Sequence, residues 1–164
     1  MNWTDGPING VVVRPLKRYT DHRGWLAELV RDDELPDGHR PAMAYVSVTH
    51  PGISRGPHEH REQADCFGFV GPGNFRVFMW DARPESPTQG QRMRLTAGES
   101  NPAIIRVPAG VVHAYVNRST QDAWVLNFPD RLFAGPGRRE PVDEIRHEDR
   151  TDNLYKLDDE GADT

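Results

Sequence analysis

Three histidines in two short segments are the residues of this sequence best suited to chemistry. His58 and His60 are separated by one residue, so in an extended strand their side chains point to the same face. His113 lies in a second β-like segment, Val111–Val116, and reaches the first two only if the strands lie close together in a closed sheet. An imidazole transfers protons near neutral pH and also binds transition metals. The three histidines therefore predict an acid–base site or a metal site.

These two interpretations compete for the same side chains. In the metal interpretation, His58, His60 and His113 supply three imidazoles and Asp65 a carboxylate, a set that suits Fe, Mn, Ni or Zn. In the other, His58 is a general base. A nitrogen lone pair that binds a metal cannot also accept a proton, so the two exclude each other. We expect no cofactor, and a divalent transition metal is the alternative.

Short apolar runs separated by turns rich in glycine and proline must position these histidines. Residues 74–81 are apolar on both parities, which is typical of a central strand covered on both sides. No stretch has a long 3.6-residue periodicity. The pattern predicts an all-β protein, a double-stranded β-helix or jelly roll of the cupin type, whose interior holds the histidines. The predicted strands are residues 10–16, 24–30, 42–49, 65–70, 74–81, 92–96, 103–107, 111–116 and 124–128.

Length and composition limit the other possibilities. A chain of 164 residues predicts a single domain, residues 1–164, with a core over about 10–134, a short C-terminal extension over about 135–157 and a frayed tail, 158–164. Its single cysteine, Cys66, excludes an internal disulfide and favours a cytoplasmic location. No apolar run approaches the ~20 residues of a membrane helix. A net charge of −5, with scattered basic residues, argues against nucleic acid as a partner.

Four segments make the sequence resemble the dTDP-4-dehydrorhamnose 3,5-epimerase family over roughly residues 10–150. They are Asp21–Glu28 (D-x-R-G-x-x-x-E), Arg55–His58 (R-G-x-H), Asp81–Gly90 (D-x-R-x-x-S-P-T-x-G) and Pro108–His113 (P-x-G-x-x-H). The third segment is long and idiosyncratic, and therefore specific. The resemblance implies a cupin jelly roll, a homodimer that exchanges edge strands, and an isomerase of carbohydrate biosynthesis. Its substrate would be a nucleotide sugar, a dTDP-4-keto-6-deoxyhexose.

The resemblance also implies roles for individual residues. His58 would be the general base that removes a proton from the carbon beside the keto group, and Arg55 could supply positive charge to the enolate oxygen. Arg23 and Glu28 match family positions that contact the nucleotide, and a guanidinium suits a diphosphate. The candidate catalytic residues are thus His58, Arg55 and Asp81, and the candidate substrate-binding residues are Arg23, Glu28, His60, His113 and Tyr115.

The sequence also departs from the family pattern. Asp65 stands where the family has a lysine, and Phe133 takes the place of its tyrosine acid. A phenyl ring cannot donate a proton, so Tyr115, Tyr45 or water would have to replace it, and we expect proton exchange at C3 rather than C5. The candidates for the family's late aspartate, which orients the base, are Asp149, Asp152 and Asp158.

The second histidine of the His58-x-His60 pair is a further departure, because it is similar to the pattern of the sugar 3,4-ketoisomerases. Together with the replaced lysine and tyrosine, it leaves two alternatives to an epimerase. One is a metal-dependent cupin enzyme that acts on a small polar substrate. The other is a catalytically silent cupin that binds a sugar nucleotide.

Overall fold

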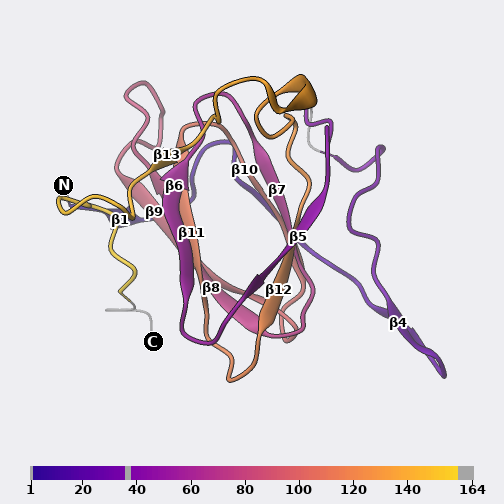
Figure 1. Ribbon diagram of the computed structural model, residues 1–164. Helices are drawn as coiled ribbons and strands as arrows, with labels where there is room; N and C mark the ends of the chain where they lie inside the picture. The colour runs from indigo at the N-terminus through magenta and orange to yellow at the C-terminus, as the bar shows by residue number, and fades with distance from the viewer. Residues whose placement is uncertain (1, 36–37, 159–164) are drawn as a thin grey trace.

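Two β-sheets packed face to face form the body of the protein (Figure 1). The computed structural model describes residues 2–35 and 38–158. One sheet has the strand order β1 (Thr4–Asp5), β9 (Gln91–Gly98), β8 (Asn74–Asp81), β11 (Val111–Asn117), β6 (Ser54–Glu59) and β13 (Ile145–Arg146). The other has the order β2 (Val12–Pro15), β10 (Ala103–Val107), β7 (Asp65–Phe69), β12 (Ala123–Asn127) and β5 (Tyr45–Thr49). The expected cupin-like jelly roll is confirmed.

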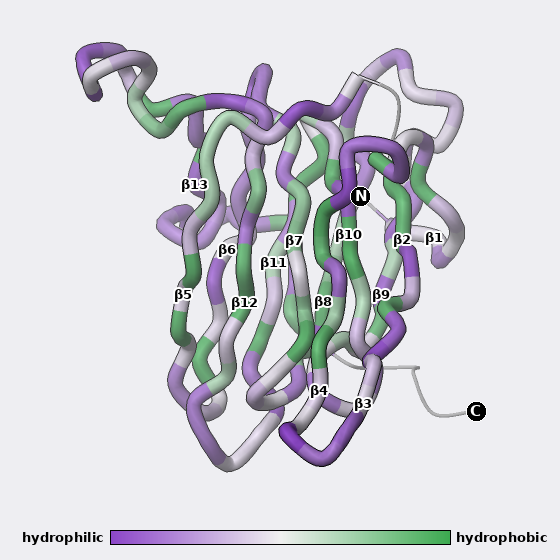
Figure 2. Tube along the Cα trace, turned by 90° about the vertical axis from the view of Figure 1, so that its right-hand side faces the viewer, coloured by the Kyte–Doolittle hydropathy of each residue, from purple (hydrophilic) through white to green (hydrophobic). Residues whose placement is uncertain are grey.

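Alternation along the strands explains the core between the two sheets. Figure 2 shows hydrophobic stretches in strands such as β8 and β10, whereas the turn between β3 and β4 is hydrophilic. One face of β8 presents Phe75, Val77 and Met79 to the interior, where Phe69 and Ile105 of the opposite sheet meet them. These side chains are all buried. These side chains therefore form a packed core between the two sheets.

A second apolar layer covers the outer face of the six-stranded sheet. Phe78 and Trp80, on the other parity of β8, lie there with Val112 and Ala114 of β11, and Tyr155 packs over them. The Trp80 and Tyr155 ring centroids are 5.5 Å apart. The expectation that residues 74–81 are covered on both sides is confirmed, and the C-terminal part of the chain supplies the cover. Residues 159–164 of the tail that we expected to fray lie outside the described residues.

A small hairpin, β3 (Tyr19–Asp21) and β4 (Gly24–Leu26), extends away from the body of the two sheets (Figure 1). The strand expected over 24–30 ends at Leu26, so the prediction was wrong for its second half. The chain turns back there because Leu29 packs with Cys66 on the outer side of the five-stranded sheet.

Two further elements differ from or add to the expected set. The strand expected from residue 42 begins only at Tyr45, because the backbone N–H of Ala42 bonds instead to the carbonyl of Pro129. A single 3₁₀ turn, η1 (Pro136–Arg138), follows β12. Over the described residues, the structure contains no helix of the length and apolarity that crossing a membrane requires.

Candidate active site

A cavity of about 1290 Å³ opens between the two sheets at the end that the core leaves free. Both sheets line it, together with the loop after β12 and the segment 140–148 that precedes and includes β13. The volume exceeds the range of about 300–1,000 Å³ usual for small-ligand pockets, so it accommodates an extended ligand. Its chemically active lining residues are Tyr45, Arg55, His58, His60, Arg61, Gln63, Tyr115, Arg131, Arg138, Arg146 and Glu144.

The pairing of β6 with β11 brings His58 and His113 together. His58 lies opposite His113 in the strand register, and their ring centroids are 4.5 Å apart. Gly56 makes this close approach feasible. It has a φ of +77°, and a Cβ atom there would lie 2.5 Å from the His113 carbonyl oxygen. The glycine of the R-G-x-H segment is therefore a requirement of strand packing.

His60 lies just beyond the end of β6 and joins the other two histidines. Its ring centroid is 5.8 Å from that of His58 and 6.1 Å from that of His113. The Nδ1 atom of His60 donates a hydrogen bond to the Asp143 carbonyl, and its Nε2 atom lies 3.2 Å from Oδ2 of Asp65. His58 and His60 line the cavity, whereas the buried His113 lies behind them.

Asp65 is the charged centre of this cluster. Its side chain is only 2% exposed, and its Oδ2 atom faces His60 and, at 3.3 Å, Nε2 of His113. Its other oxygen accepts hydrogen bonds from the side-chain amides of Gln63 and Asn127. Burial alone would raise the pKa of Asp65, but the imidazoles of His113 and His60 that face it hold the pKa far below its usual range. The carboxylate is therefore ionised.

Asp65 in turn sets the charge of the imidazoles. Burial opposes protonation of His60, but the hydrogen bond to Asp65 and its negative charge prevail, so that the pKa of His60 rises to about 9. For His58, burial and the neighbouring His113 and His60 act in the same direction and lower the pKa to about 2. The cavity wall thus carries a neutral His58 with a free lone pair next to a positively charged His60.

The segment before β13 closes one side of the cavity and brings a carboxylate to His58. Oε1 of Glu144 lies 3.9 Å from Nδ1 of His58. The neighbouring Asp143 holds the segment in place, because its carboxylate accepts the backbone N–H groups of Arg61, Glu62 and Gln63. None of the aspartates expected to orient the base does so: Asp152 pairs with Arg150, Asp158 lies 3.9 Å from Arg92, and Asp149 is exposed.

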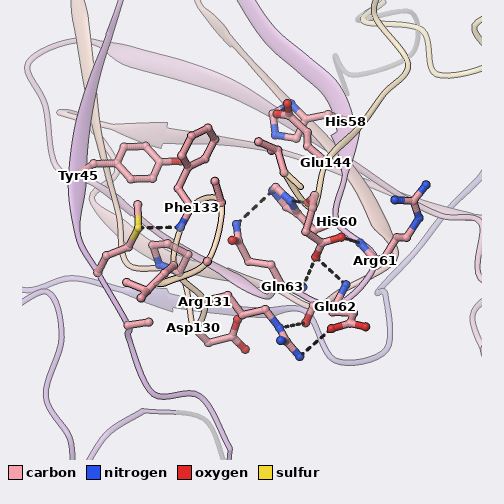
Figure 3. A pocket seen from close by; sticks show the side chains of 18 of the residues that line it. Tyr45, His58, His60, Arg61, Glu62, Gln63, Asp130, Arg131, Phe133 and Glu144 are labelled. Atoms are coloured by element: carbon pink, nitrogen blue, oxygen red, sulfur yellow. Dashed lines mark hydrogen bonds and ion pairs between the residues drawn. The ribbon is translucent and has the colours of Figure 1, made fainter. Parts of the chain in front are cut away.

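Two tyrosines reach the cavity from the interior faces of β5 and β11. The Tyr45 hydroxyl accepts a hydrogen bond of 2.9 Å from the amide of Asn127. The Tyr115 hydroxyl is 3.3 Å from Oγ of Ser47. In Figure 3, Tyr45 and Phe133 lie at one side of the cavity and His58 and Glu144 at the other. A phenol and an imidazole base therefore face each other across the space.

Arginine side chains line the same cavity, among carboxylates such as Glu62, which pairs with Arg131 at 3.1 Å. Arg55 is held against β5, where its Nε atom donates to Oγ1 of Thr49 and its Nη2 atom to the Val48 carbonyl. Four more arginines lie around the mouth, and such always-charged side chains suit a diphosphate group. They are Arg61, Arg131, Arg138 and Arg146.

Asp81 does not belong to this site. It lies at the end of β8, and its carboxylate accepts hydrogen bonds from Arg83, Ser86 and Thr88 within the loop that leads to β9. None of these four residues lines the cavity. The D-x-R-x-x-S-P-T-x-G segment therefore closes a loop, and the structure gives its aspartate a structural environment in place of the catalytic one we expected.

Arg23 and Glu28 also lie outside the cavity of their own chain. Arg23 sits at the turn of the exposed β3–β4 hairpin, where its guanidinium pairs with Asp21 at 2.6 Å. Glu28 follows the hairpin and binds Arg31 at 3.2 Å. The structure thus unites His58, Arg55, His60 and Tyr115 at one cavity but leaves these two residues on a protruding arm.

Of the expected metal ligands, only the three histidines are grouped closely enough to bind one ion. The ligand atoms of His58, His60 and His113 all lie within 4.8 Å of one another. The buried Nε2 atom of His113 has no hydrogen bond of good geometry. Both nitrogens of His60, however, already have oxygen partners, and Asp65 faces two imidazoles while it holds two amides. The donor set fits a charge network better than an ion.

Sequence reasoning missed several residues that complete the site. Glu144 lies in a segment without a recognisable pattern, and only the short pairing of β13, which places Arg146 opposite His58, brings it to the base. In the sequence, nothing distinguishes Asn127 from other residues at the end of an interior strand. The alternation of that strand, which points Ala123, Val125 and Asn127 to the same face, is the signal that could have found it.

The fold is that of a cupin-like jelly roll, and its cavity is lined by the His58 imidazole on one sheet and the Tyr45 phenol on the other. A sequence model of the dTDP-4-dehydrorhamnose 3,5-epimerase family matches residues 5–134. The chain therefore belongs to this family, and the expectation that it is an isomerase, an epimerase of the dTDP-sugar type, is confirmed.

Individual relatives agree with the family assignment. A probable low-salt glycan biosynthesis epimerase, Agl13, of Haloferax volcanii is 37% identical over 128 residues, which cover 77% of this chain and 81% of the relative. The spore coat polysaccharide biosynthesis protein SpsL of Bacillus subtilis is 39% identical over 108 residues, 66% of this chain and 70% of SpsL.

Solved structures share the fold at lower identity. The crystal structure of ChmJ, a 3'-monoepimerase from Streptomyces bikiniensis in complex with dTDP-quinovose, superimposes with a TM-score of 0.73 at 24% identity, over 97% of this chain and 83% of ChmJ. A dTDP sugar isomerase from Desulfovibrio desulfuricans also gives a TM-score of 0.73 at 24% identity, over 85% of this chain and 84% of that one.

Proposed function

We propose that the protein epimerises a dTDP-4-keto-6-deoxyhexose and that His58 is its general base. The observation that carries this proposal is the imidazole of His58 on the cavity wall, with the carboxylate of Glu144 3.9 Å from its Nδ1 atom. It takes a proton from the carbon next to the keto group, and the electron pair of the broken C–H bond forms the C=C bond of an enolate while the carbonyl electrons move to the oxygen. Return of a proton to the opposite face restores the ketone and inverts the carbon.

Fixed positive charge supports the enolate in this proposal. The guanidinium of Arg55 and the imidazolium of His60 both line the cavity, and charges placed in advance stabilise a developing oxyanion. Asp65 stands where the family has a lysine, but this replacement does not leave the site without a positive charge at that place. It holds the proton on His60, so that an imidazolium takes over the place of the missing ammonium group.

Glu144 is the residue that supports the orientation of the base. Its Oε1 atom faces Nδ1 of His58, and its Oε2 atom is fixed by Arg146 at 2.7 Å. A carboxylate behind an imidazole favours the tautomer with the proton on Nδ1 and leaves the lone pair of Nε2 for the substrate. Glu144 thus acts as a positioning residue in the role we expected of a late aspartate.

We also propose that two copies of the chain form a homodimer that exchanges edge elements. The outward face of β5 and β12 exposes Val46, Val48 and Trp124, an apolar patch at the edge of the five-stranded sheet. The β3–β4 hairpin extends in isolation from the body, so Arg23 and Glu28 can serve a nucleotide only across such an interface. The buried, unpaired Cys66 supports a location in the reducing cytoplasm.

The test of the proposed activity is proton exchange with solvent. In D2O, the protein should wash deuterium into the ring of a dTDP-4-keto-6-deoxyhexose, at C3 in preference to C5, because Phe133 cannot donate. The variant His58→Asn should lower the exchange by ~10²-fold or more, the usual contribution of a general base. NMR of the sugar protons measures both carbons.

Two results would contradict the proposal. If the wild-type protein binds the sugar nucleotide without exchange at either carbon, it is a silent binding protein. If His58→Asn exchanges as fast as the wild type, another base is at work. Asp122→Asn is a suitable control, since it alters an exposed carboxylate that pairs with the surface residue His50.

A further inference from the structure

Inversion requires a second proton-transfer group, and the side chains of β5 show where it is. Alternate residues of β5 face the cavity, so that Tyr45 and Ser47 both line it. β5 belongs to the five-stranded sheet and β6, with His58, to the six-stranded one. A ligand between the sheets therefore has His58 on one face and the Tyr45 hydroxyl on the other (Figure 3).

The hydrogen bonds of Asn127 determine how the Tyr45 hydroxyl can act. The backbone N–H of Cys66 donates to Oδ1 of Asn127, so the amide nitrogen must point the other way, toward Tyr45 and Asp65. The Tyr45 oxygen consequently accepts a hydrogen bond of 2.9 Å from a buried, fixed donor. Its own O–H is left to donate to a group in the cavity, and the same amide stabilises the phenolate that donation produces.

The other two candidate positions are less suitable. Tyr115 is only 5% exposed, against 43% for Tyr45. Burial raises the pKa of Tyr115 to about 12, and its hydroxyl is directed to Ser47. Phe133 lines the cavity but carries no hydroxyl. Of the described side chains, Tyr45 is the phenol that combines an open approach with a partner for its anion.

We propose, on the basis of the epimerase function above, that Tyr45 is the catalytic acid of this enzyme and protonates the enolate on the face opposite His58. The O–H bond of Tyr45 breaks as the C–H bond forms, the enolate electrons move from the C=C bond to the new C–H bond, and the keto group is restored. Tyr45 is left as a phenolate held by Asn127, and it regains a proton from water that enters through the open side of the cavity.

The electrostatic surroundings agree with this role. Burial raises the pKa of Tyr45 above its ordinary value, and the hydrogen bond from Asn127 partly opposes this rise. The hydroxyl is therefore protonated at neutral pH and ready to donate. No oxidant or further reactant is needed, because the proton taken by His58 and the proton given by Tyr45 balance.

The experiment separates deprotonation from inversion. Tyr45→Phe removes one oxygen from a half-exposed side chain, so the variant should melt like the wild type. With a dTDP-4-keto-6-deoxyhexose in D2O, it should still exchange deuterium with retained configuration, because His58 can return a solvent proton to the face it deprotonates. Formation of the epimer should fall by ~10²-fold or more. Tyr45→Met should show the same split.

The matched control is Tyr155→Phe, which removes a phenol oxygen from the outer layer next to Trp80 and should leave both rates unchanged. Undiminished epimer formation by Tyr45→Phe would overturn the assignment, and so would equal loss of exchange and epimer formation in a folded variant that still binds dTDP. Failure of the wild-type protein to exchange or epimerise would refute the proposed function instead.

Discussion

At the scale of single residues, a buried carboxylate organises the site without touching the substrate. Asp65 draws a proton onto His60, and the resulting positive charge helps to keep His58 neutral. The same carboxylate accepts a hydrogen bond from the side-chain amide of Asn127, which also donates to the Tyr45 hydroxyl. One side chain at the family's lysine position therefore influences the base, the local cation and the proposed acid. Substitution of Asp65 should disturb all three together.

This network leads us to expect a metal-free enzyme. A bound ion would have to displace Asp65 from His60 and would occupy the lone pair that His58 needs as a base. Elemental analysis of the purified protein should therefore find transition metals well below one equivalent, and treatment with EDTA should leave proton exchange unchanged. Near-stoichiometric metal that chelation removes together with the activity would contradict the base mechanism.

The sequence could predict this site only in part, for a physical reason. His58, His60, Arg55 and Tyr115 are recoverable because strand alternation and the R-G-x-H pattern locate them on two neighbouring strands. Glu144 cannot be found from the sequence, since its position depends on the pairing of β13 and on hydrogen bonds of Asp143 that span 80 residues or more of the chain. Long-range contacts of loops leave no periodic trace in a sequence.

At the scale of elements, the loop between β8 and β9 shows how a strong motif can mislead. The resemblance of this segment to the family made Asp81 a catalytic candidate, yet the carboxylate organises the loop. Arg83 binds both oxygens, at 2.8 and 2.9 Å, and the hydroxyls of Ser86 and Thr88 bind Oδ2 at 2.5 and 2.6 Å. The strands themselves, by contrast, were largely predictable, because alternation is a local property. The strand predicted over residues 24–30 was too long, because Leu29 packs against the five-stranded sheet and takes the chain out of the hairpin.

The variant Asp81→Asn should therefore lower stability and leave the chemistry intact. Burial opposes ionisation of Asp81, but the bonds from Arg83, Ser86 and Thr88 hold its pKa well below the usual range. Asp81 thus stabilises the fold above the pKa of the unfolded chain, about 4, and loses this contribution as the pH falls toward the folded-state value.

At neutral pH, the substitution should cost about 2 kcal/mol of unfolding free energy, the scale of lost hydrogen bonds to a charged group. Urea unfolding measures the cost, which should shrink when the titration is repeated at about pH 3. Glu85→Gln, in the same loop but exposed, is the control. A loss of proton exchange without a loss of stability would show that Asp81 acts in catalysis after all.

At the scale of the whole molecule, the exposed apolar patch and the protruding hairpin point to a second copy. Light scattering at micromolar concentration should give about twice the chain mass of 18.6 kDa. Trp124→Glu places a charge in the patch and should shift the protein toward monomers. Trp25→Glu tests separately whether the β3–β4 hairpin contributes to the dimer. A monomeric wild-type protein would contradict the dimer and would leave Arg23 and Glu28 without a route to the nucleotide.

The hydrogen bonds that the Asp143 carboxylate accepts from the turn after β6 have a consequence for how such an enzyme can change its substrate. The family match ends at residue 134, yet the wall that holds Glu144 and Arg146 comes from the chain that follows. This wall is joined to the jelly roll by two paired residues of β13 and by a few hydrogen bonds to the turn after β6. A replacement of that short stretch can thus reshape the cavity while the barrel core stays intact. The residues that shape this wall are thus largely separate from those that stabilise the barrel, so substrate specificity can change without loss of the fold.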